Sequence, residues 1–336
     1  MTIKEISKMV GVSPATVSLA LNNKEGVSEE TKKIIWHIAN KYGYVKKGVM
    51  KKNILFIKYI GNGAAIEHNG DFVARIIDAI ESAVSNLNYN LVIKNIEAGS
   101  FDKEIHSVNF DDFEGIILLG TELEDHEGKL ISNINIPVVA VDHMFEDYDV
   151  DSVVMDNYGG IFTAVKYLYD LGHREIGYID SNIQFSNFDQ RRLGYFRALD
   201  KLNLTFKASY IKIVAPNLEG AYNSMLTQLE KKQPLPTAFI AANDTIAIGT
   251  IKALKEKDIN VPEDISIIGF DDIPFGKILD KPLTTMQVDK EQIGYLAVSV
   301  LHNKINKVSQ GHIKTLTRTN LIKRESTLPP AITIKG

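Results

Sequence analysis

The sequence predicts a small all-α head followed by an α/β core made of two doubly wound parallel-sheet sub-domains. Two observations lead to this fold class. Residues 2–44 contain three short helical patterns, and from Asn53 onward short apolar runs alternate with helical stretches. Strands that are apolar almost throughout belong to parallel sheets with helices on both faces. The number of such runs fits two sheets.

Two short helices with a tight turn between them are predicted for residues 2–22. Thr2 and Glu5 have the spacing of a capping box, and Gly11 ends the first helix. Ser13 then provides a new N-cap, and Pro14 stands at the first helical position, where its missing N–H is harmless. This pair of helices is typical of a helix-turn-helix reader of DNA.

The second helix has two faces of different character. Val17, Ala20 and Leu21 are expected to pack against the first helix, while a stripe of small or polar groups is left for the DNA groove. A third helix follows Ser28 and ends at Gly43. Its expected apolar face comprises Ile34, Ile35, Ile38, Ala39 and Tyr42. The expected DNA contacts are Thr2, Ser13, Pro14, Ala15, Thr16, Ser18, Leu19, Asn22, Lys46, Lys47 and Met50.

Charge separates the head from the rest of the chain. Residues 1–52 hold ten Lys and four acidic residues, or 10 − 4 = +6, and the remainder carries −10, which gives the total of −4. A plain helical bundle is the alternative to a DNA-binding head. A basic head on an acidic body favours the phosphate-binding interpretation.

The composition narrows the function classes. The 336-residue chain has no Cys, and its eight His include no metal-ligand spacing, so we expect no disulfide, metal or other cofactor. It shows neither a signal segment nor a long apolar run, so we expect a cytoplasmic protein without membrane contact. Gly61–Ile66 begins like a dinucleotide fingerprint but lacks its third small residue. The sequence has neither a nucleophile elbow nor a Walker loop, so no motif in it suggests an enzyme.

Helices and strands alternate through the core. The expected strands are Ile54–Ile60, Asn90–Ile96, Gly115–Leu119, Pro137–Val141, Glu175–Ile179, Tyr210–Ile213, Ala238–Ala241, Ser266–Gly269 and Thr284–Val288. The expected helices include Phe72–Leu87, Gly159–Leu171, Leu193–Leu202, Thr245–Glu256 and Lys290–Asn306. In such folds ligands bind beyond the carboxyl ends of the strands.

Three expected strands end in acids or amides. Asp142 follows one, Asn243 and Asp244 another, and Asp271 and Asp272 a third. Together they predict a polar site, although a structural role is an even alternative for any single acid. That role is the better expectation for Asp244, which directly precedes a long helix, and for Asp272, which lies in a turn.

The motifs resemble the lactose/galactose repressor family over nearly the whole chain. The residues that carry the resemblance are Gly11–Ser18, Leu21–Asn22, Val27–Ser28, Tyr42–Tyr44, Asn243–Gly249, Pro262–Asp272 and Pro282–Thr285. The resemblance implies a core of the type I periplasmic-binding-protein kind. It also implies that Asp142, Asn243, Asp271 and Arg191 contact the hydroxyl groups of an effector.

Further candidates surround this polar set. Tyr59, Phe72, Phe185 and Phe188 are candidate walls for the apolar face of a sugar, with a core role as the alternative for each. His68 lies in a turn before a core helix and is a candidate for the same site.

The chain departs from the family pattern in two places. The linker Val45–Asn53 is short and lacks the family's hinge-helix motif, so Lys46 and Lys47 are expected on phosphates and Met50 as a substitute wedge in the minor groove. A linker that is simply solvated is an equal alternative for the lysines. Leu19 stands where the family commonly has Arg, and it can pack on a thymine methyl. The last twelve residues contain no leucine heptads, which favours a homodimer.

The predicted organisation follows. Residues 1–46 form the head, 47–53 a Lys-rich linker, and 54–336 an effector-binding and dimerisation core, with sub-domains at about 54–155 with 285–315 and about 156–284 with 316–330. We expect a dimeric repressor of carbohydrate-utilisation genes that binds a pseudo-palindromic operator and is released by a sugar or sugar phosphate. The alternatives are a corepressor-dependent regulator and a metabolic enzyme with an attached DNA-binding head.

Overall fold

The computed structural model describes residues 2–21, 24, 26–42, 44, 52–61 and 70–331. The chain divides into two compact units, Met1–Lys51 and Lys52–Gly336. Each unit has its own hydrophobic core. Within the described residues no helix is both long and apolar enough to cross a bilayer.

The head consists of three helices whose first two begin as the sequence predicts. In α1 (Ile3–Val10) the Glu5 amide donates to Thr2 Oγ1 and the Thr2 amide donates to Glu5 Oε2, so the capping box is complete. Gly11 ends the helix in the left-handed conformation, with φ of 74°. In α2 (Pro14–Leu21) the Thr16 amide donates to Ser13 Oγ at 3.0 Å.

The small head core joins all three helices. Val17, Ala20 and Leu21 are buried as expected, together with Ile6 of α1. In α3 (Glu29–Lys41), Ile35 and Ala39 are buried. The expected apolar face is wrong at Ile34 and Tyr42, which are exposed, because only about one face of a 13-residue helix can lie against the two short ones.

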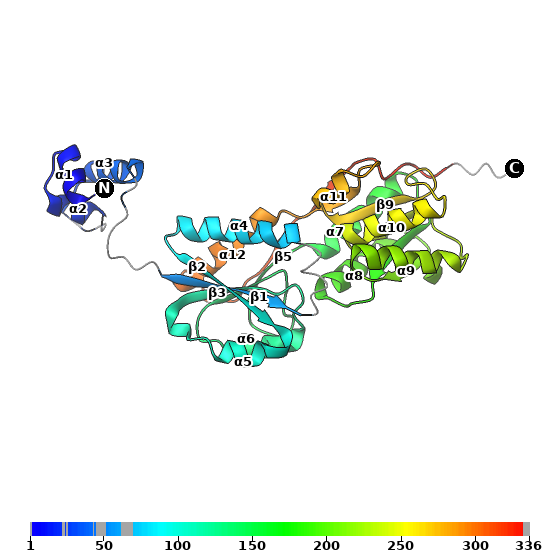
Figure 1. Cartoon of the computed structure of the whole chain (residues 1–336), viewed down its shortest axis with the longest axis horizontal. Helices are drawn as coiled ribbons and strands as arrows, with labels where there is room; N and C mark the ends of the chain where they lie inside the picture. The colour runs from blue at the N-terminus through cyan, green and yellow to red at the C-terminus, as the bar shows by residue number, and fades with distance from the viewer. Residues whose placement is uncertain are drawn as a thin grey trace. The chain divides into compact units, whose positions relative to one another are not determined.

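The first sheet of the core is entirely parallel. Its order is β11 (Lys314–Thr317), β5 (Asp151–Met155), β4 (Val138–Val141), β3 (Phe113–Leu119), β1 (Asn53–Ile60) and β2 (Asn90–Glu97). Helices α4 (Gly70–Asn86) and α12 (Lys290–Ile305) cover one face, and α5 (Phe101–His106) and α6 (Gly128–Ile131) cover the other (Figure 1). Burial on both faces explains the nearly continuous apolar strands.

The second sheet has one antiparallel edge strand. Its order is β12 (Asn320–Ile322), β10 (Thr284–Gln287), β9 (Ser266–Asp271), β8 (Ala238–Ala241), β6 (Ile176–Ser181) and β7 (Ile211–Val214), and only β12 runs against its neighbour. The helices pack pairwise, α7 (Asn157–Asp170) on α8 (Ser186–Lys201) and α9 (Leu218–Glu230) on α10 (Asp244–Glu256). The order places the carboxyl ends of β6, β8 and β9 side by side.

The chain passes between the two sheets at three places. It leaves the first sheet after Met155, returns between Gln287 and Lys290, and leaves again between Thr317 and Asn320. The expected return at about residue 285 is a few residues early, because β10 pairs with β9 through Gln287. The expected exit at 315 is early for the same kind of reason, since β11 pairs with β5 through Thr317.

In the described part of the chain, seven helices and strands were not among those named from the sequence, namely the strands β5, β11 and β12 and the helices α5, α6, α9 and α11 (Pro274–Lys277). The three strands have three to five residues each, too short for a clear period. Helix α8 starts at Ser186 instead of Leu193 because its first turns are polar in sequence yet partly buried, with Asn187 and Arg191 both in the interior.

A close contact between β9 and the start of α10 gives the first test. The buried Asp244 carboxylate accepts from Thr285 Oγ1 at 2.6 Å and from the Ile273 amide at 2.9 Å. A Cβ on Gly269 would lie 2.0 Å from Asp244 Oδ1. Gly269→Ala should therefore lower the free energy of unfolding by roughly 1–3 kcal/mol in urea titrations.

Gly99→Ala is the matched control, because a Cβ at Gly99 meets no atom within 4 Å. Equal stability of the two variants would contradict the close packing of Asp244 against β9.

Candidate functional site

The buried guanidinium of Arg191 lies at the centre of a polar cluster between the two sheets. The side chain is only 4% exposed. Its Nε donates to Asn157 Oδ1 at 2.8 Å, its Nη1 to the Ala242 carbonyl at 2.6 Å and its Nη2 to Asp271 Oδ1 at 3.3 Å. The guanidinium also stacks 3.8 Å from the centroid of the Phe270 ring. One side chain thus joins α7, β8 and β9.

A chain of hydrogen bonds runs from Arg191 to the first sheet. Asn157 Nδ2 donates to Asn187 Oδ1 at 2.8 Å, and Asn187 Nδ2 donates to Asp142 Oδ1 at 2.9 Å. Asp142 Oδ2 accepts from Thr121 Oγ1 at 2.6 Å. Asp142 follows β4 of the first sheet, whereas Asn157 and Asn187 belong to helices of the second. The Asn187–Asp142 bond therefore crosses the junction between the sub-domains.

The electrostatics of the cluster follow from its burial. Burial raises the pKa of Asp142 to about 6, opposed by the Thr121 hydrogen bond and by the Arg191 charge. Burial, with the charge of Asp271, raises the pKa of Asp244 to about 8. Both carboxylates are thus costly to charge, and the Arg191 cation offsets part of that cost at Asp142.

The backbone at two of these strand ends is unusual. Asp142 has φ of 64° and Asp271 has φ of 110°, both in the region that favours glycine. Such conformations cost of order 1–3 kcal/mol each and persist where the surroundings hold them. Here the side-chain bonds to Asn187 and Arg191 do so, and both carboxylates end up at the junction.

The other strand-end residues have structural partners. Asn243 Oδ1 accepts from the Ile246 amide at 2.8 Å and so caps α10. Asp244 is held by Thr285 and Ile273, as described above. Asp272 Oδ1 accepts from Arg324 Nη2 at 2.5 Å, which ties the turn after β9 to the strand β12 region. Asn243 lies beside the Ala242 carbonyl that binds Arg191, so it adjoins the cluster.

The four candidate aromatics occupy different places. Phe188 lies 5.7 Å from the Arg191 guanidinium and packs on Phe185. Phe72 lies in the first turn of α4, and its ring faces the ammonium of Lys290. Tyr59 belongs to the second core cluster, where it packs on Phe101 and donates to Glu127 Oε1 at 2.7 Å. Strand alternation explains this, because Tyr59 lies on the α5–α6 face of the sheet, apart from Arg191.

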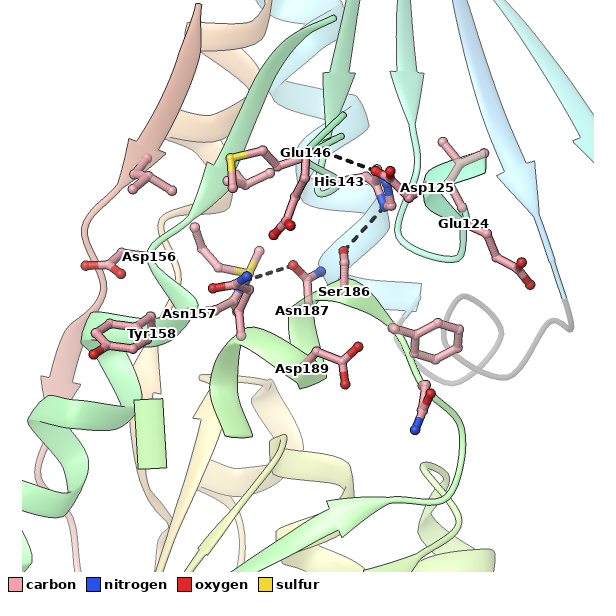
Figure 2. A pocket seen from close by; sticks show the side chains of 18 of the residues that line it. Glu124, Asp125, His143, Glu146, Asp156, Asn157, Tyr158, Ser186, Asn187 and Asp189 are labelled. Atoms are coloured by element: carbon pink, nitrogen blue, oxygen red, sulfur yellow. Dashed lines mark hydrogen bonds between the residues drawn. The ribbon is translucent and has the colours of Figure 1, made fainter. Parts of the chain in front are cut away.

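A pocket of about 640 Å³ opens beside the cluster (Figure 2). The loops after β3 and β4, the end of β5 and the starts of α7 and α8 line it. Asn157 and Asn187 of the hydrogen-bonded chain and the candidate Phe185 are among the lining residues. Its carboxylates are Glu124, Asp125, Glu146, Asp147, Asp156 and Asp189. In the described part of the chain, no group of three or more His, Asp or Glu residues is arranged to hold a metal ion.

His143 is a buried histidine that lines this pocket. Its Nδ1 lies 3.3 Å from Ser186 Oγ, and its Nε2 has no hydrogen-bond partner among the described residues. Burial lowers the pKa of His143 to about 4, so the imidazole is neutral near pH 7.

Sequence reasoning missed Thr121, Asn157, Asn187, His143 and Lys290 at this junction. Neutral amides and hydroxyls in helix starts carry no sequence signal for a site, since they are equally common as caps. His143 follows a candidate acid directly, and that position was the one available clue.

The head presents its expected contacts on the surface to different degrees. Thr2, Ser13, Pro14 and Ala15 are exposed, and Thr16, Ser18 and Leu19 are partly buried. The hydroxyls of Thr2 and Ser13 cap their helices. Asn22, Lys46, Lys47, Met50 and His68 lie outside the described residues.

A helix-turn-helix head joined to a two-sheet core with a polar junction defines the class of DNA-binding regulators that respond to ligands. Comparisons with known proteins identify the family. Residues 2–47 match the model of the lacI family of bacterial regulatory proteins, and residues 165–327 match that of the periplasmic binding protein-like domain. The chain belongs to the lacI family and is a helix-turn-helix transcriptional repressor.

Its relatives match over nearly their full length. The protein named "Probable HTH-type transcriptional repressor ExuR" of Bacillus subtilis is 32% identical, over 97% of this chain and 98% of the relative. The repressor PurR of Pasteurella multocida is 29% identical with the same coverage. The ribose operon repressor of Haemophilus influenzae is 28% identical, again over 97% and 98%.

Solved structures share the fold. The lac repressor dimer bound to operator and an anti-inducer superposes with a TM-score of 0.75 at 21% identity, over 98% of this chain and 99% of that one. The complex of the regulator CelR with cellobiose gives 0.73 at 21% identity, over 97% and 99%. A regulator from Enterococcus faecium with bound ribose gives 0.69 at 22% identity, over 83% and 99%.

The raised pKa of Asp142 gives a test of the site's electrostatics. Between pH 4 and 6 the folded protein keeps a proton that the unfolded chain has released, so this group lowers the free energy of unfolding as pH rises. Asp142→Asn removes this pH-dependent contribution to the free energy of unfolding. The stability of the variant relative to the wild type should increase by about 2 kcal/mol from pH 4 to pH 7 in urea titrations.

Asp78→Asn, on the exposed side of α4, controls for the loss of one carboxylate. A stability difference between Asp142→Asn and the wild type that does not change with pH would show that burial does not raise the pKa of Asp142.

Proposed function

We propose that a small, hydroxyl-rich effector binds at the junction of the two sheets and controls how a dimer of this repressor holds its operator. The observation that carries the proposal is the hydrogen-bonded chain from Asp271 through Arg191, Asn157 and Asn187 to Asp142. It connects residues of both sub-domains. A ligand that displaces or joins these bonds favours one relative arrangement of the sheets over another.

The chemistry of the cluster supports a sugar-like effector. Carboxylates accept and guanidinium groups donate hydrogen bonds, which is the combination that recognises hydroxyls. Phe188 supplies an aromatic face next to Arg191. Relatives and solved homologues include a ribose operon repressor and a regulator bound to cellobiose. We therefore infer that the chain represses carbohydrate-utilisation genes in the cytoplasm and is released by its effector.

Exposed apolar surface supports a homodimer. Phe275 in α11 (Pro274–Lys277) and the neighbouring Ile278 are 65% and 76% exposed. Val92 and Ile93 are also exposed on β2, the edge strand of the first sheet. Exposed edge strands and apolar patches of this kind are commonly covered by a partner. Two-fold symmetry would then place two heads on the two half-sites of a pseudo-palindromic operator.

The coupling between effector and operator is reciprocal. If the effector lowers operator affinity by a given factor, operator DNA lowers effector affinity by the same factor. The alternative is a corepressor that tightens operator binding. Operator titrations with and without effector distinguish the two, because only the sign of the change differs.

A substitution at Leu19 tests whether this residue of the head contacts bases. Leu19 lies on α2 in the stripe opposite the buried Val17 and Ala20. Leu19→Arg introduces a side chain that can donate two hydrogen bonds to one guanine. The operator sequences selected from a randomised library should therefore shift towards guanine at one symmetric position in each half-site. The expected discrimination is roughly 1–3 kcal/mol. Lys46→Ala should instead weaken all sequences alike.

An unchanged selected operator in Leu19→Arg would mean that residue 19 does not face the bases.

Asp271 is a test of the effector site. Asp271→Asn keeps the shape of the side chain but removes the charge that Arg191 faces. The effector is first found as the sugar that raises the melting temperature of the wild type in a thermal-shift screen. Its binding to Asp271→Asn should be weaker by roughly 1.5–3 kcal/mol, or at least tenfold, in calorimetry. Operator affinity without sugar should stay within about twofold, since Asp271 is not in the head.

Asp280→Asn is the matched control, because this exposed carboxylate pairs with Lys255 on the surface. Unchanged sugar binding by Asp271→Asn would place the effector elsewhere.

A further inference from the structure

Lys290 is a buried cation at the same junction. It begins α12 and is 4% exposed. Its Nζ donates to the Asp271 carbonyl at 2.5 Å and lies 3.5 Å from the Val288 carbonyl, and it stands 5.6 Å from the centroid of the Phe72 ring. Within the described ranges, no carboxylate oxygen lies within 4 Å of Nζ; its nearest partners are neutral carbonyls.

This arrangement differs from that of three other shielded cations, which have carboxylate partners. Arg191 pairs with Asp271, Arg324 with Asp272 and Lys304 with Asp151, each within 3.3 Å. An ammonium group taken out of water is costly unless an anion neutralises it. It also has three hydrogens to donate, and two carbonyls account for two of them. Among the described residues, the Lys290 ammonium therefore has no anion to neutralise its charge and one N–H without an acceptor.

The position of Lys290 ties it to the effector cluster. Its helix α12 packs with α4 against the first sheet, whereas the carbonyl that it binds ends β9 of the second sheet. The same residue, Asp271, offers its side chain to Arg191. Arg191 and Lys290 thus contact one residue at the sub-domain junction through its carboxylate and its carbonyl.

We propose that Lys290 binds an acidic group of the effector, a carboxylate or a phosphate carried on a hydroxyl-bearing molecule. This inference rests on the proposed function, because it adds a charged group to the effector of that site. The pocket in Figure 2 is lined by six carboxylates and by neither Lys nor Arg, a charge distribution that disfavours an acidic group there. The acid is therefore bound at the Lys290 end, and Asp142 and Arg191 bind hydroxyls.

The test compares matched sugars on the full-length protein. Glucose, galactose and mannose are each paired with the corresponding uronate and 6-phosphate, in a thermal-shift screen followed by calorimetry. The wild type should be stabilised by acidic members and bind them at least tenfold more tightly than the neutral sugar of the same ring. Uronate against 6-phosphate shows which acid the site takes.

Two variants remove the charge. Lys290→Met should weaken binding of the acidic sugar tenfold to a hundredfold, and Lys290→Gln, which can still donate to the Asp271 carbonyl, should do the same if the Met variant does not fold. Lys212→Met is the matched control. Lys212 is also a buried lysine without a carboxylate partner among the described residues, but it lies on the edge strand β7 beside Gln233.

The outcomes separate the two proposals. If a neutral sugar binds as tightly as its acid, or if both Lys290 variants bind the acid as the wild type does, the role of Lys290 is overturned while the effector site stands. If no member of the series, neutral or acidic, stabilises the wild type, the proposed effector class fails and the role of Lys290 fails with it. Loss of acid binding in Lys212→Met as well would also overturn the assignment.

Discussion

The Arg191 guanidinium is the interaction on which the junction depends. It is almost fully buried, and its charge is tolerated because Asp271, Asn157, the Ala242 carbonyl and the Phe270 ring surround it. Removing one partner of such an arrangement leaves the other charge buried and unpaired, which costs roughly 3–5 kcal/mol. The same group thus holds the start of α8 against two strand ends and keeps polar atoms available between the sheets.

Stability and function share residues at this junction. Asp142 and Asp271 hold backbone conformations that favour glycine, and their side chains are bonded to helices of the second sub-domain. A ligand that competes for these bonds changes the balance between the sub-domains without any change in the cores of the two sheets. This is how a small molecule can influence a separate DNA-binding unit, since only a difference in affinity for two states is required.

Much of the fold was predictable because its signals are local. The capping box of Thr2 and Glu5 and the caps at Ser13 and Ser28 depend on neighbours within four residues, and all are present. Most core strands were predictable from apolar runs. The start of α8 was not, because Asn187 and Arg191 read as solvated polar residues and only their partners on other elements bury them.

The sequence by itself determined the helix-turn-helix head, the alternation of strands and helices, and the set of acids at strand ends, because each follows from short-range propensity or spacing. The tertiary structure decided which of those acids meet. Asp142 and Asp271 come together through Arg191 and two asparagines from helix starts, while Asp244 and Asp272 are used within the second sub-domain. It also placed Tyr59 in a core and left Lys290 without an anionic partner among the described residues, since contacts between residues 68 and 19 positions apart are set by tertiary packing.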